Sequence, residues 1–269
     1  MRLADCRVLL TGASGGIGLA LTEQLCARGA RVLAVSRHPE ALSAMRQRYP
    51  QQLAWVGADL RRPEGRTQVL EAARGIGDLN VLVNAAGVNR FALLDQVDEG
   101  EAEDMLALNV SATLLLTRAL LPLLRQRSHA LVVNVGSIYG SIGYPGYAIY
   151  CASKFALRGF SEALRRELAD TPVNVLYVAP RATRTAMNSQ AAMALNAELN
   201  VGVDEPEQVA GAVIGAIEKD LSELYLGWPE KFFVRLNSML PGLVDRALHK
   251  QLPIIRRFSA THPGKDHSR

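Results

Sequence analysis

A tyrosine and a lysine stand four residues apart, at positions Tyr150 and Lys154. On a helix, residues at this spacing project from one face, with Cβ atoms about 5 to 6 Å apart. A phenol with a pKa of about 10 is a poor base at neutral pH, but a nearby ammonium group favours the phenolate. The spacing therefore predicts a tyrosine that takes part in proton transfer.

A glycine-rich turn, Thr11–Gly18, directly follows an apolar run over residues 6–11. Glycines let the backbone turn sharply and approach a pyrophosphate, and the N–H groups and dipole at the start of the next helix attract its negative charge. Taken alone, the turn is also compatible with a tight connection. Its place at the first strand-to-helix junction favours a dinucleotide site.

Short apolar runs alternate with stretches of helical periodicity over residues 1–227. The predicted strands are 6–11, 31–35, 53–56, 79–83, 130–135, 173–178 and 224–226, and the predicted helices are 16–28, 39–48, 63–74, 101–124, 150–168 and 206–218. Runs such as Leu131–Val135 are apolar at nearly every position, which is typical of parallel strands buried on both faces. We therefore expect an α/β fold: a Rossmann-like, doubly wound, mostly seven-stranded parallel sheet with helices on both faces and ligands beyond the strands' carboxyl ends.

The composition is that of an ordinary globular chain, with 49% hydrophobic and 21% charged residues over 269 positions. Three cysteines without Cys-x-x-Cys spacing predict neither a disulfide framework nor a metal site, and they favour a reducing compartment. The glycine-rich turn leaves no room for a secretory leader before it. Residues 128–153 lack Asp, Glu, Lys and Arg but contain glycines, a proline and tyrosines, so we interpret them as an active-site region of a cytoplasmic protein.

The order and spacing of the motifs resemble the short-chain dehydrogenase/reductase family over residues 3 to 227. The turn has the Thr-Gly-x-x-x-Gly-x-Gly pattern, and the later matches follow in family order. They are Asn84-Ala85-Ala86-Gly87 after the fourth strand, Asn109 in the next long helix, Ser137 after the fifth strand, and Tyr150-x-x-x-Lys154.

The resemblance implies catalytic roles for Asn109, Ser137, Tyr150 and Lys154. Tyr150 would protonate a carbonyl oxygen as hydride arrives from a nicotinamide, or remove the proton in reverse, and Ser137 would hydrogen-bond the same oxygen. Lys154 would also hold the nicotinamide ribose, and Asn109 would support a water in a proton relay. Taken singly, Asn109 and Ser137 are equally explained as locally satisfied polar residues.

Cofactor preference depends on Ser36 and Arg37 after the second strand. A ribose 2′-hydroxyl is commonly read by a carboxylate, which is missing there, whereas an arginine suits a 2′-phosphate. This favours NADP(H), with NAD(H) as the alternative, although Arg37 could be a solvated surface cation and the family's other basic position is Gly15. The predicted cofactor-binding residues are Gly12, Ser14, Gly15, Gly16, Ile17, Gly18, Ser36, Arg37, Asp59, Leu60, Asn84, Ala85, Ala86, Gly87, Tyr150, Lys154, Pro180, Thr183 and Thr185.

Two of these assignments have a competing interpretation. Asp59 and Leu60 match the family pair that reads adenine, yet Asp59 could cap the following turn. After the sixth strand the family pattern Pro-Gly is here Pro180-Arg181. If that position requires a positive φ, Arg181 is strained; otherwise it projects a cation toward the nicotinamide or substrate, and backbone contacts from Thr183 become doubtful.

The substrate pocket is expected to be apolar. Residues 186–203 occupy the place of the family's substrate lid, and the loop before Tyr150 would form the opposite wall. The candidates are Met187, Met193, Leu195 and Leu199 in the lid and Tyr139, Ile142, Tyr144, Pro145 and Tyr147 in the loop. Core packing explains such spacings equally well.

The net charge of +4 lies in the C-terminal part of the chain. Residues 228–269 hold eight Lys or Arg against three Asp or Glu, and no basic module with interleaved aromatics indicates nucleic-acid binding. We predict two amphipathic helices there, 231–240 and 243–252, the first with Phe232, Phe233, Leu236 and Leu240 on one face. They fit packing over the cleft or a second subunit best, then a membrane surface or an acidic carrier protein. Residues 259–269 are predicted to be a polar, frayed end.

We therefore predict a catalytic domain, 1–227, with a basic C-terminal extension, 228–269. The predicted function is an NADP(H)-preferring oxidoreductase that interconverts an apolar ketone or aldehyde and an alcohol. The alternatives are a reductase of carrier- or membrane-presented acyl or steroid-like ketones and a non-catalytic nucleotide sensor. The resemblance also implies a homodimer or homotetramer, joined through helices 101–124 and 150–168.

Overall fold

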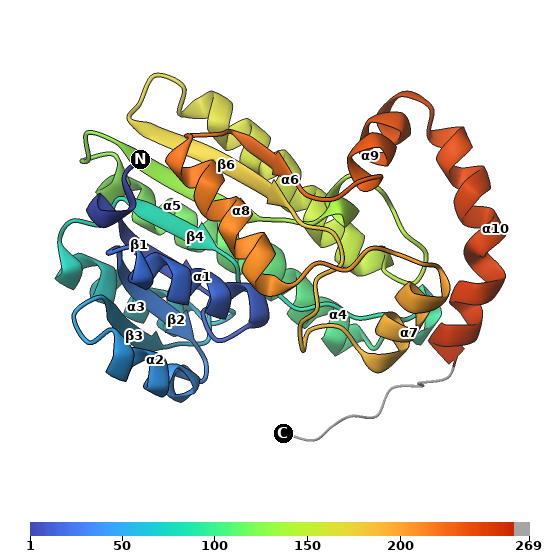
Figure 1. Ribbon diagram of the computed structural model, residues 1–269, viewed down its shortest axis with the longest axis horizontal. Coiled ribbons are helices and arrows are strands. Elements are labelled where there is room, and N and C mark those ends of the chain that lie inside the picture. Colours follow the sequence, from blue (N-terminus) through green and yellow to red (C-terminus); the bar gives the residue numbers. More distant parts are fainter. Residues whose placement is uncertain (261–269) are drawn as a thin grey trace.

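The computed structural model describes residues 1–260 and contains one seven-stranded parallel sheet in the order β3-β2-β1-β4-β5-β6-β7 (Figure 1). The strands are β1 Arg7–Thr11, β2 Arg31–Ser36, β3 Leu53–Gly57, β4 Val81–Asn84, β5 Ala130–Val135, β6 Val173–Ala179 and β7 Glu223–Tyr225. The predicted doubly wound sheet is confirmed, and its predicted strand ends differ from these by no more than two residues.

The sheet reverses its winding direction between β1 and β4. From β1 the chain runs outward to β2 and β3 and then returns to place β4 on the other side of β1. The register pairs Thr11 with both Val35 and Asn84, so three strands end at the same level. Crossovers that diverge at such a point leave a crevice beyond the strand ends, which is where ligands bind in folds of this kind.

Helices cover both faces of the sheet because side chains alternate along each strand. Val8 packs with α1 and α8 on one face, whereas its neighbour Leu9 packs with α3, α5 and α6 on the other (Figure 1). The helices are α1 Gly16–Ala27, α2 Ser43–Arg48, α3 Pro63–Ile76, α4 Glu99–Leu106, α5 Thr113–Leu124, α6 Ala148–Glu167, α7 Gln190–Glu198, α8 Pro206–Glu218, α9 Glu230–Met239 and α10 Pro241–Ala260.

The predicted single α-helix over 101–124 is interrupted. A π-helical segment, Ala107–Ala112, joins α4 to α5, and it contains Asn109. The joined helix is long and apolar enough to cross a membrane by length and composition alone. However, Leu116, Leu120 and Leu124 are fully buried against the sheet, so packing in the core accounts for part of its apolar character. Similarly, the predicted helix 39–48 is a turn of 3-10 helix followed by α2.

The C-terminal extension forms α9 and α10 at the end of the molecule away from β3 (Figure 1). Helix α10 begins at Pro241 and continues to Ala260, so it is longer than the predicted 243–252. Proline is well tolerated in a first helical turn, and Pro253 lies inside the helix without ending it. Of the predicted frayed end, residues 259–260 belong to α10 and 261–269 lie outside the described residues.

The extension contacts the body at two places. Val234 of α9 packs with Ile138 and Tyr177, and Ile255 of α10 packs with Leu195 of α7 and Tyr147. The extension thus bridges the loop before α6 and the lid helix. The division of the chain at residue 227 stays a prediction.

Candidate active site

A cavity of about 420 Å³ runs from the glycine-rich turn to Tyr150 and Lys154, at the carboxyl ends of the strands. It gathers most of the predicted site residues: Gly12, Ser14, Gly15, Gly16, Ile17, Gly18, Ala85, Gly87, Ser137, Tyr150, Lys154, Pro180, Thr183 and Thr185. The motifs that are dispersed in sequence therefore form one continuous surface.

The glycine-rich turn is shaped for close backbone approach. Gly12 has a φ of +70°, and a Cβ there would lie 2.8 Å from the Cα of Ala86. Helix α1 has no side-chain cap, so the N–H groups of its first turn, at Gly16 and Ile17, remain available at the cavity wall. The turn thus fits a dinucleotide pyrophosphate, which those N–H groups would hold.

Tyr150 and Lys154 face the same cavity from one side of α6. Both are nearly buried, and the Lys154 Nζ lies 5.7 Å from the centre of the Tyr150 ring. The Nζ also donates a hydrogen bond of 3.1 Å to the carbonyl oxygen of Val135 at the end of β5. This bond fixes the ammonium group at the junction of the sheet and the cavity.

Burial decides the protonation of this pair. It raises the pKa of Tyr150 to about 12, against the opposing effect of a hydrogen bond with Ser137, and it lowers the pKa of Lys154 to about 8. In the protein alone, desolvation therefore raises the tyrosine pKa. That the ammonium group and the positively charged nicotinamide of an oxidised cofactor together favour the phenolate stays a prediction for the complex. At neutral pH the Tyr150 hydroxyl is protonated and can donate to a carbonyl oxygen.

Ser137 caps a short helix and also lines the cavity, and its catalytic role stays a prediction. Its Oγ accepts a hydrogen bond of 3.1 Å from the Tyr139 N–H and thereby caps the short helix Ile138–Gly140. The residue also lines the cavity together with Tyr150. The cap sets the direction of the hydroxyl, and the cavity gives it access to a ligand.

Asn109 lies outside the cavity lining and is 1% exposed. Its amide accepts from the Val88 N–H at 2.9 Å and donates to the Val88 carbonyl at 2.9 Å and to the Ser153 Oγ at 3.0 Å. The side chain therefore holds the irregular segment that follows β4 against α6. Its predicted part in a proton relay stays a prediction.

Six other predicted cofactor residues also lie outside the lining, and most of them have structural partners. Asn84 donates to Thr117 and Asn134 within the core. The hydroxyls of Ser36 and Ser14 are 2.6 Å apart, which ties the end of β2 to the glycine-rich turn. The residues outside the lining are Ser36, Arg37, Asp59, Leu60, Asn84 and Ala86.

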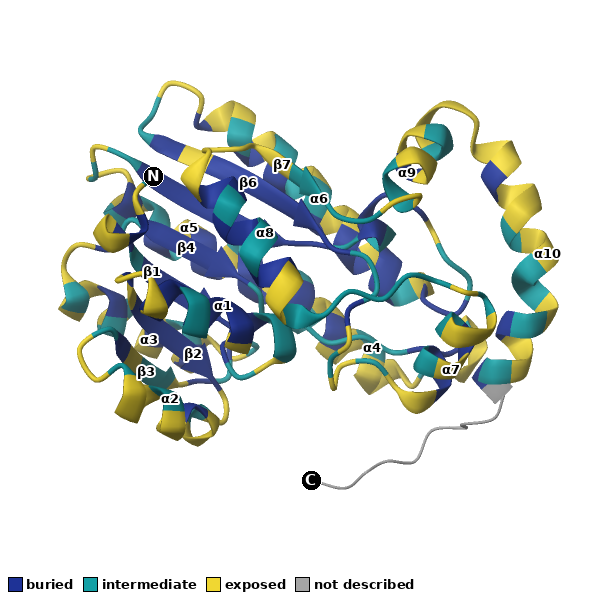
Figure 2. Ribbon diagram, viewed as in Figure 1, coloured by how far each residue is buried: buried dark blue, intermediate teal, exposed yellow. Residues whose placement is uncertain are grey.

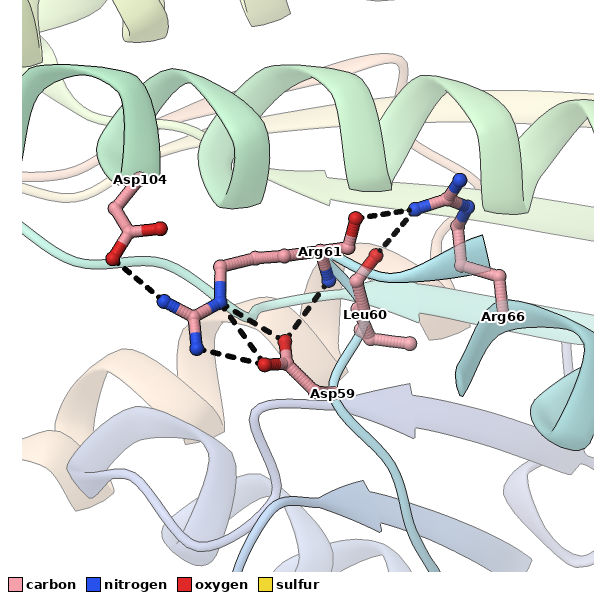
Figure 3. Close-up of polar contacts among 5 residues, drawn as sticks. All are labelled: Asp59, Leu60, Arg61, Arg66 and Asp104. Atoms are coloured by element: carbon pink, nitrogen blue, oxygen red, sulfur yellow. Dashed lines mark hydrogen bonds and ion pairs between the residues drawn. The ribbon is translucent and has the colours of Figure 1, made fainter. Parts of the chain in front are cut away.

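Figure 3 shows that the Asp59 carboxylate is held by Arg61, which also reaches Asp104. The guanidinium lowers the pKa of Asp59 to about 2, with a smaller contribution from Arg37. Asp59 also accepts from the Arg61 N–H at 3.0 Å, so the turn role weighed for it is present. The exposed Arg37 directly follows β2 and lies near enough to Asp59 to affect its pKa, so a ligand beyond the end of β2 would meet it.

The walls of the cavity are less apolar than predicted. Tyr139, Tyr147 and Met187 line it as expected, but Met193, Leu195, Leu199, Ile142, Tyr144 and Pro145 do not. Leu195 instead packs against α10. The lining also includes polar side chains that no motif indicated: Asn89, Asn188, Asn196 and Glu230.

Arg181 is not strained, and it lines the cavity, where the second outcome considered for it placed a cation. It is not among the residues with a positive φ. Its guanidinium lies 2.7 Å from the Asp204 Oδ1 and 3.5 Å from the Glu230 Oε2, and it donates to the Trp228 carbonyl at 3.3 Å. The residue therefore links the end of β6 to Asp204, which follows residues 186–203, and to Trp228 and Glu230 of the extension.

Replacing Arg181 with alanine is expected to lower the free energy of unfolding by about 3 kcal/mol, because Asp204 and Glu230 would keep partly buried charges without a partner. Urea unfolding measures the change. Arg184→Ala is the matched control, since the Arg184–Glu205 pair is exposed and should contribute no more than about 1 kcal/mol. Equal losses in the two variants would contradict a special role for Arg181.

Residues 7–196 match the family model for short chain dehydrogenases. The chain belongs to this family. As a short-chain dehydrogenase it is an oxidoreductase enzyme, and the family resemblance seen in its motifs is confirmed. Among residues 1–260, no group of three or more His, Cys, Asp or Glu could hold a metal ion.

Several known proteins are similar to this short-chain dehydrogenase. It is 30% identical to the uncharacterized oxidoreductase YxnA of Bacillus subtilis over 93% of its length and 73% of that protein. It is 34% identical to the 3-oxoacyl-(acyl-carrier-protein) reductase FabG of Escherichia coli over 66% of its length and 74% of that protein. A short chain dehydrogenase from Burkholderia cenocepacia, solved in complex with NADP, is 28% identical with a TM-score of 0.80, covering 92% of this chain and 99% of that one.

Proposed function

We propose that this short-chain dehydrogenase is an NADP(H)-preferring enzyme that interconverts a ketone or aldehyde and the corresponding alcohol on a largely apolar substrate. The observation that carries the proposal is the meeting of Ser137, Tyr150 and Lys154 in one cavity that continues to the glycine-rich turn. Dinucleotide, carbonyl and proton donor would all have access to that cavity.

The residues of the chain supply binding and proton transfer. A bound nicotinamide dinucleotide would supply or accept the hydride. Tyr150 donates its hydroxyl proton to the carbonyl oxygen, and Ser137 hydrogen-bonds the same oxygen and stabilises its developing charge. Lys154 lies close enough to contribute positive charge and to hold the ribose hydroxyls. In the reverse direction Tyr150 takes the proton from the alcohol.

Turnover tests the proposal directly. The purified chain is mixed with NADPH and a panel of aliphatic and polycyclic ketones, and NADPH oxidation is followed by absorbance. We expect turnover of apolar ketones and little turnover of sugars. Tight NADPH binding without turnover across the panel would instead support the nucleotide-sensing alternative, which the presence of Ser137, Tyr150 and Lys154 disfavours.

The preference for NADP(H) rests on Arg37, with NAD(H) as the alternative. Its exposed guanidinium follows β2, and no ion pair of Arg37 occurs within residues 1–260, so it is available for a 2′-phosphate. The NADP complex of the Burkholderia cenocepacia relative supports this choice.

Arg37→Ala should weaken NADPH binding about tenfold or more while changing NADH binding little, because only NADPH carries the phosphate. Fluorescence titration of both dinucleotides measures the effect. Arg31→Ala, at the opposite end of β2, is the matched control and should change neither affinity. An equal loss for both dinucleotides in Arg37→Ala would contradict the assignment.

The similarity to a 3-oxoacyl reductase supports a second candidate, a reductase of carrier-presented acyl ketones. A higher kcat/KM for an acyl-carrier substrate than for the matching free ketone would favour it. We also propose a cytoplasmic homodimer or homotetramer. Leu106, Leu115 and Phe155 are each at least 40% exposed on α4, α5 and α6, and such a contact would cover them.

A further inference from the structure

Part of the apolar stripe of α9 faces away from the body of the protein, because Leu236 packs on the body whereas Phe232 and Phe233 are exposed. Val234 is buried and Asn237 donates to the Ser141 carbonyl, so these residues mark the inward side. On the other side, Phe232 is 53% exposed and Met239 is 79% exposed (Figure 2). An amphipathic helix of a globular protein normally turns its apolar stripe toward the core. This orientation indicates that the stripe has a partner outside the described chain.

The exposed apolar side chains continue around the turn between α9 and α10. Together they form a surface that we call the apolar tip: Trp228, Phe232, Phe233, Met239, Leu240 and Leu243. Thirteen large hydrophobic side chains are exposed in the described residues, and six of them belong to this short stretch. Single exposed hydrophobics are ordinary, whereas a contiguous group of this kind marks an interaction site.

Basic side chains border the apolar tip. Arg235 lies on α9, and Arg246 and Lys250 follow on α10, all exposed. None of the three forms an ion pair within the described part of the chain, in contrast to the paired Arg181 nearby. Aromatic, leucine and methionine side chains flanked by unpaired cations are the composition of an interfacial surface that binds anionic lipid headgroups.

Charge distinguishes a lipid surface from a second copy of the chain. In a twofold contact the same patch would face itself, so Arg235, Arg246 and Lys250 would approach the same cations of the other copy. An anionic bilayer instead offers complementary charge. The position also favours lipid, since α9, α10 and the turn between them lie at one edge of the molecule (Figure 1).

We propose that the C-terminal extension is a peripheral membrane anchor, in which the apolar tip enters the headgroup region of an anionic bilayer and Arg235, Arg246 and Lys250 contact lipid phosphates. The anchor is coupled to the active site through Arg181, which joins the cavity wall to Trp228 and Glu230 at the start of α9. Docking would therefore hold the cavity near the lipid phase. Membrane binding itself does not depend on the proposed reaction.

The test is co-sedimentation of the full chain with two kinds of vesicle, phosphatidylcholine alone and an equimolar mixture with phosphatidylglycerol. We expect binding to the mixture, weaker binding to phosphatidylcholine, and loss of binding as salt increases. The double variant Phe232→Ser with Met239→Ser should reduce the partition coefficient at least about tenfold. Leu94→Ser is the matched control, because Leu94 is 65% exposed but lies outside the extension.

A second pair of measurements excludes the other occupants. Arg235→Gln and Arg246→Gln should each weaken binding to the anionic vesicles about fivefold. Absence of wild-type binding to both vesicle types would overturn the proposal. Unchanged binding in the Phe232/Met239 variant would also overturn it, because it would indicate a charge-only surface suited to an acidic protein. Loss of an oligomer in that variant, measured by light scattering, would overturn it too, because it would indicate that a second copy covers the surface. Unchanged NADPH binding shows that each variant is folded.

Discussion

Replacing Tyr150 with phenylalanine is expected to lower kcat/KM for carbonyl reduction by about 10³-fold, within the range that general acid catalysis supplies. The change removes the hydroxyl that donates the proton and leaves the ring. The ring packs at 6.1 Å from Tyr147 and beneath the Lys154 ammonium, and both contacts survive the substitution. NADPH affinity should therefore change little.

Steady-state reduction kinetics and fluorescence titration of NADPH measure the two effects separately. Tyr139→Phe is a suitable control, since Tyr139 lines the same cavity and lies edge-on to Tyr150 with ring centres 6.3 Å apart. We expect that variant to keep its turnover within about tenfold of the wild type. If Tyr150→Phe retained as much activity as Tyr139→Phe, Tyr150 would not be the proton donor.

The fold and the centre of the site were predictable because their signals are local. Parallel strands buried on both faces produce unbroken apolar runs, and these runs locate the strands along the chain. The glycine-rich turn and the Tyr150/Lys154 pair each depend on residues a few positions apart. A helix or a turn of fixed geometry then brings those residues to one place.

The other features depend on partners that are distant in sequence. Arg181 meets Asp204 and Glu230 only through the tertiary fold, so no local pattern indicated that this cation at the cavity wall is ion-paired. The orientation of α9 is a second example. Its stripe was visible in the sequence, but the two faces of the helix differ in burial only because of what the body offers to Val234.

The pKa values of the central pair could not be predicted from the sequence for a related reason. Sequence spacing gives the separation of Tyr150 and Lys154 but not the burial around them, and here burial is the larger effect. Burial favours the uncharged form of each group: the phenol for Tyr150 and the amine for Lys154. The ammonium group is therefore kept at neutral pH at a cost to the stability of the fold.

Lys154→Met is accordingly expected to stabilise the protein while it reduces turnover at least about 100-fold. The folded-state pKa of about 8 lies below the ordinary value of 10.5, so burying the ammonium group destabilises the fold by up to about 3 kcal/mol below pH 8. As the pH rises from 8 toward 10.5, the folded chain has lost this proton while the unfolded chain still binds it. The contribution of Lys154 to the stability of the wild type therefore rises in that window, and the variant lacks this gain.

Urea unfolding of the dinucleotide-free protein measures both effects. At neutral pH Lys154→Met should exceed the wild type in free energy of unfolding, and the difference should shrink as the pH approaches 10. The measurements stop at pH 10 because the pKa of Tyr150 is raised in the folded chain. The fold therefore loses stability above the ordinary tyrosine pKa of 10.0. Lys219→Met, at an exposed position, should change stability by no more than about 0.5 kcal/mol at either pH. A pH-independent loss of stability in Lys154→Met would show that the Val135 hydrogen bond outweighs the burial of the charge.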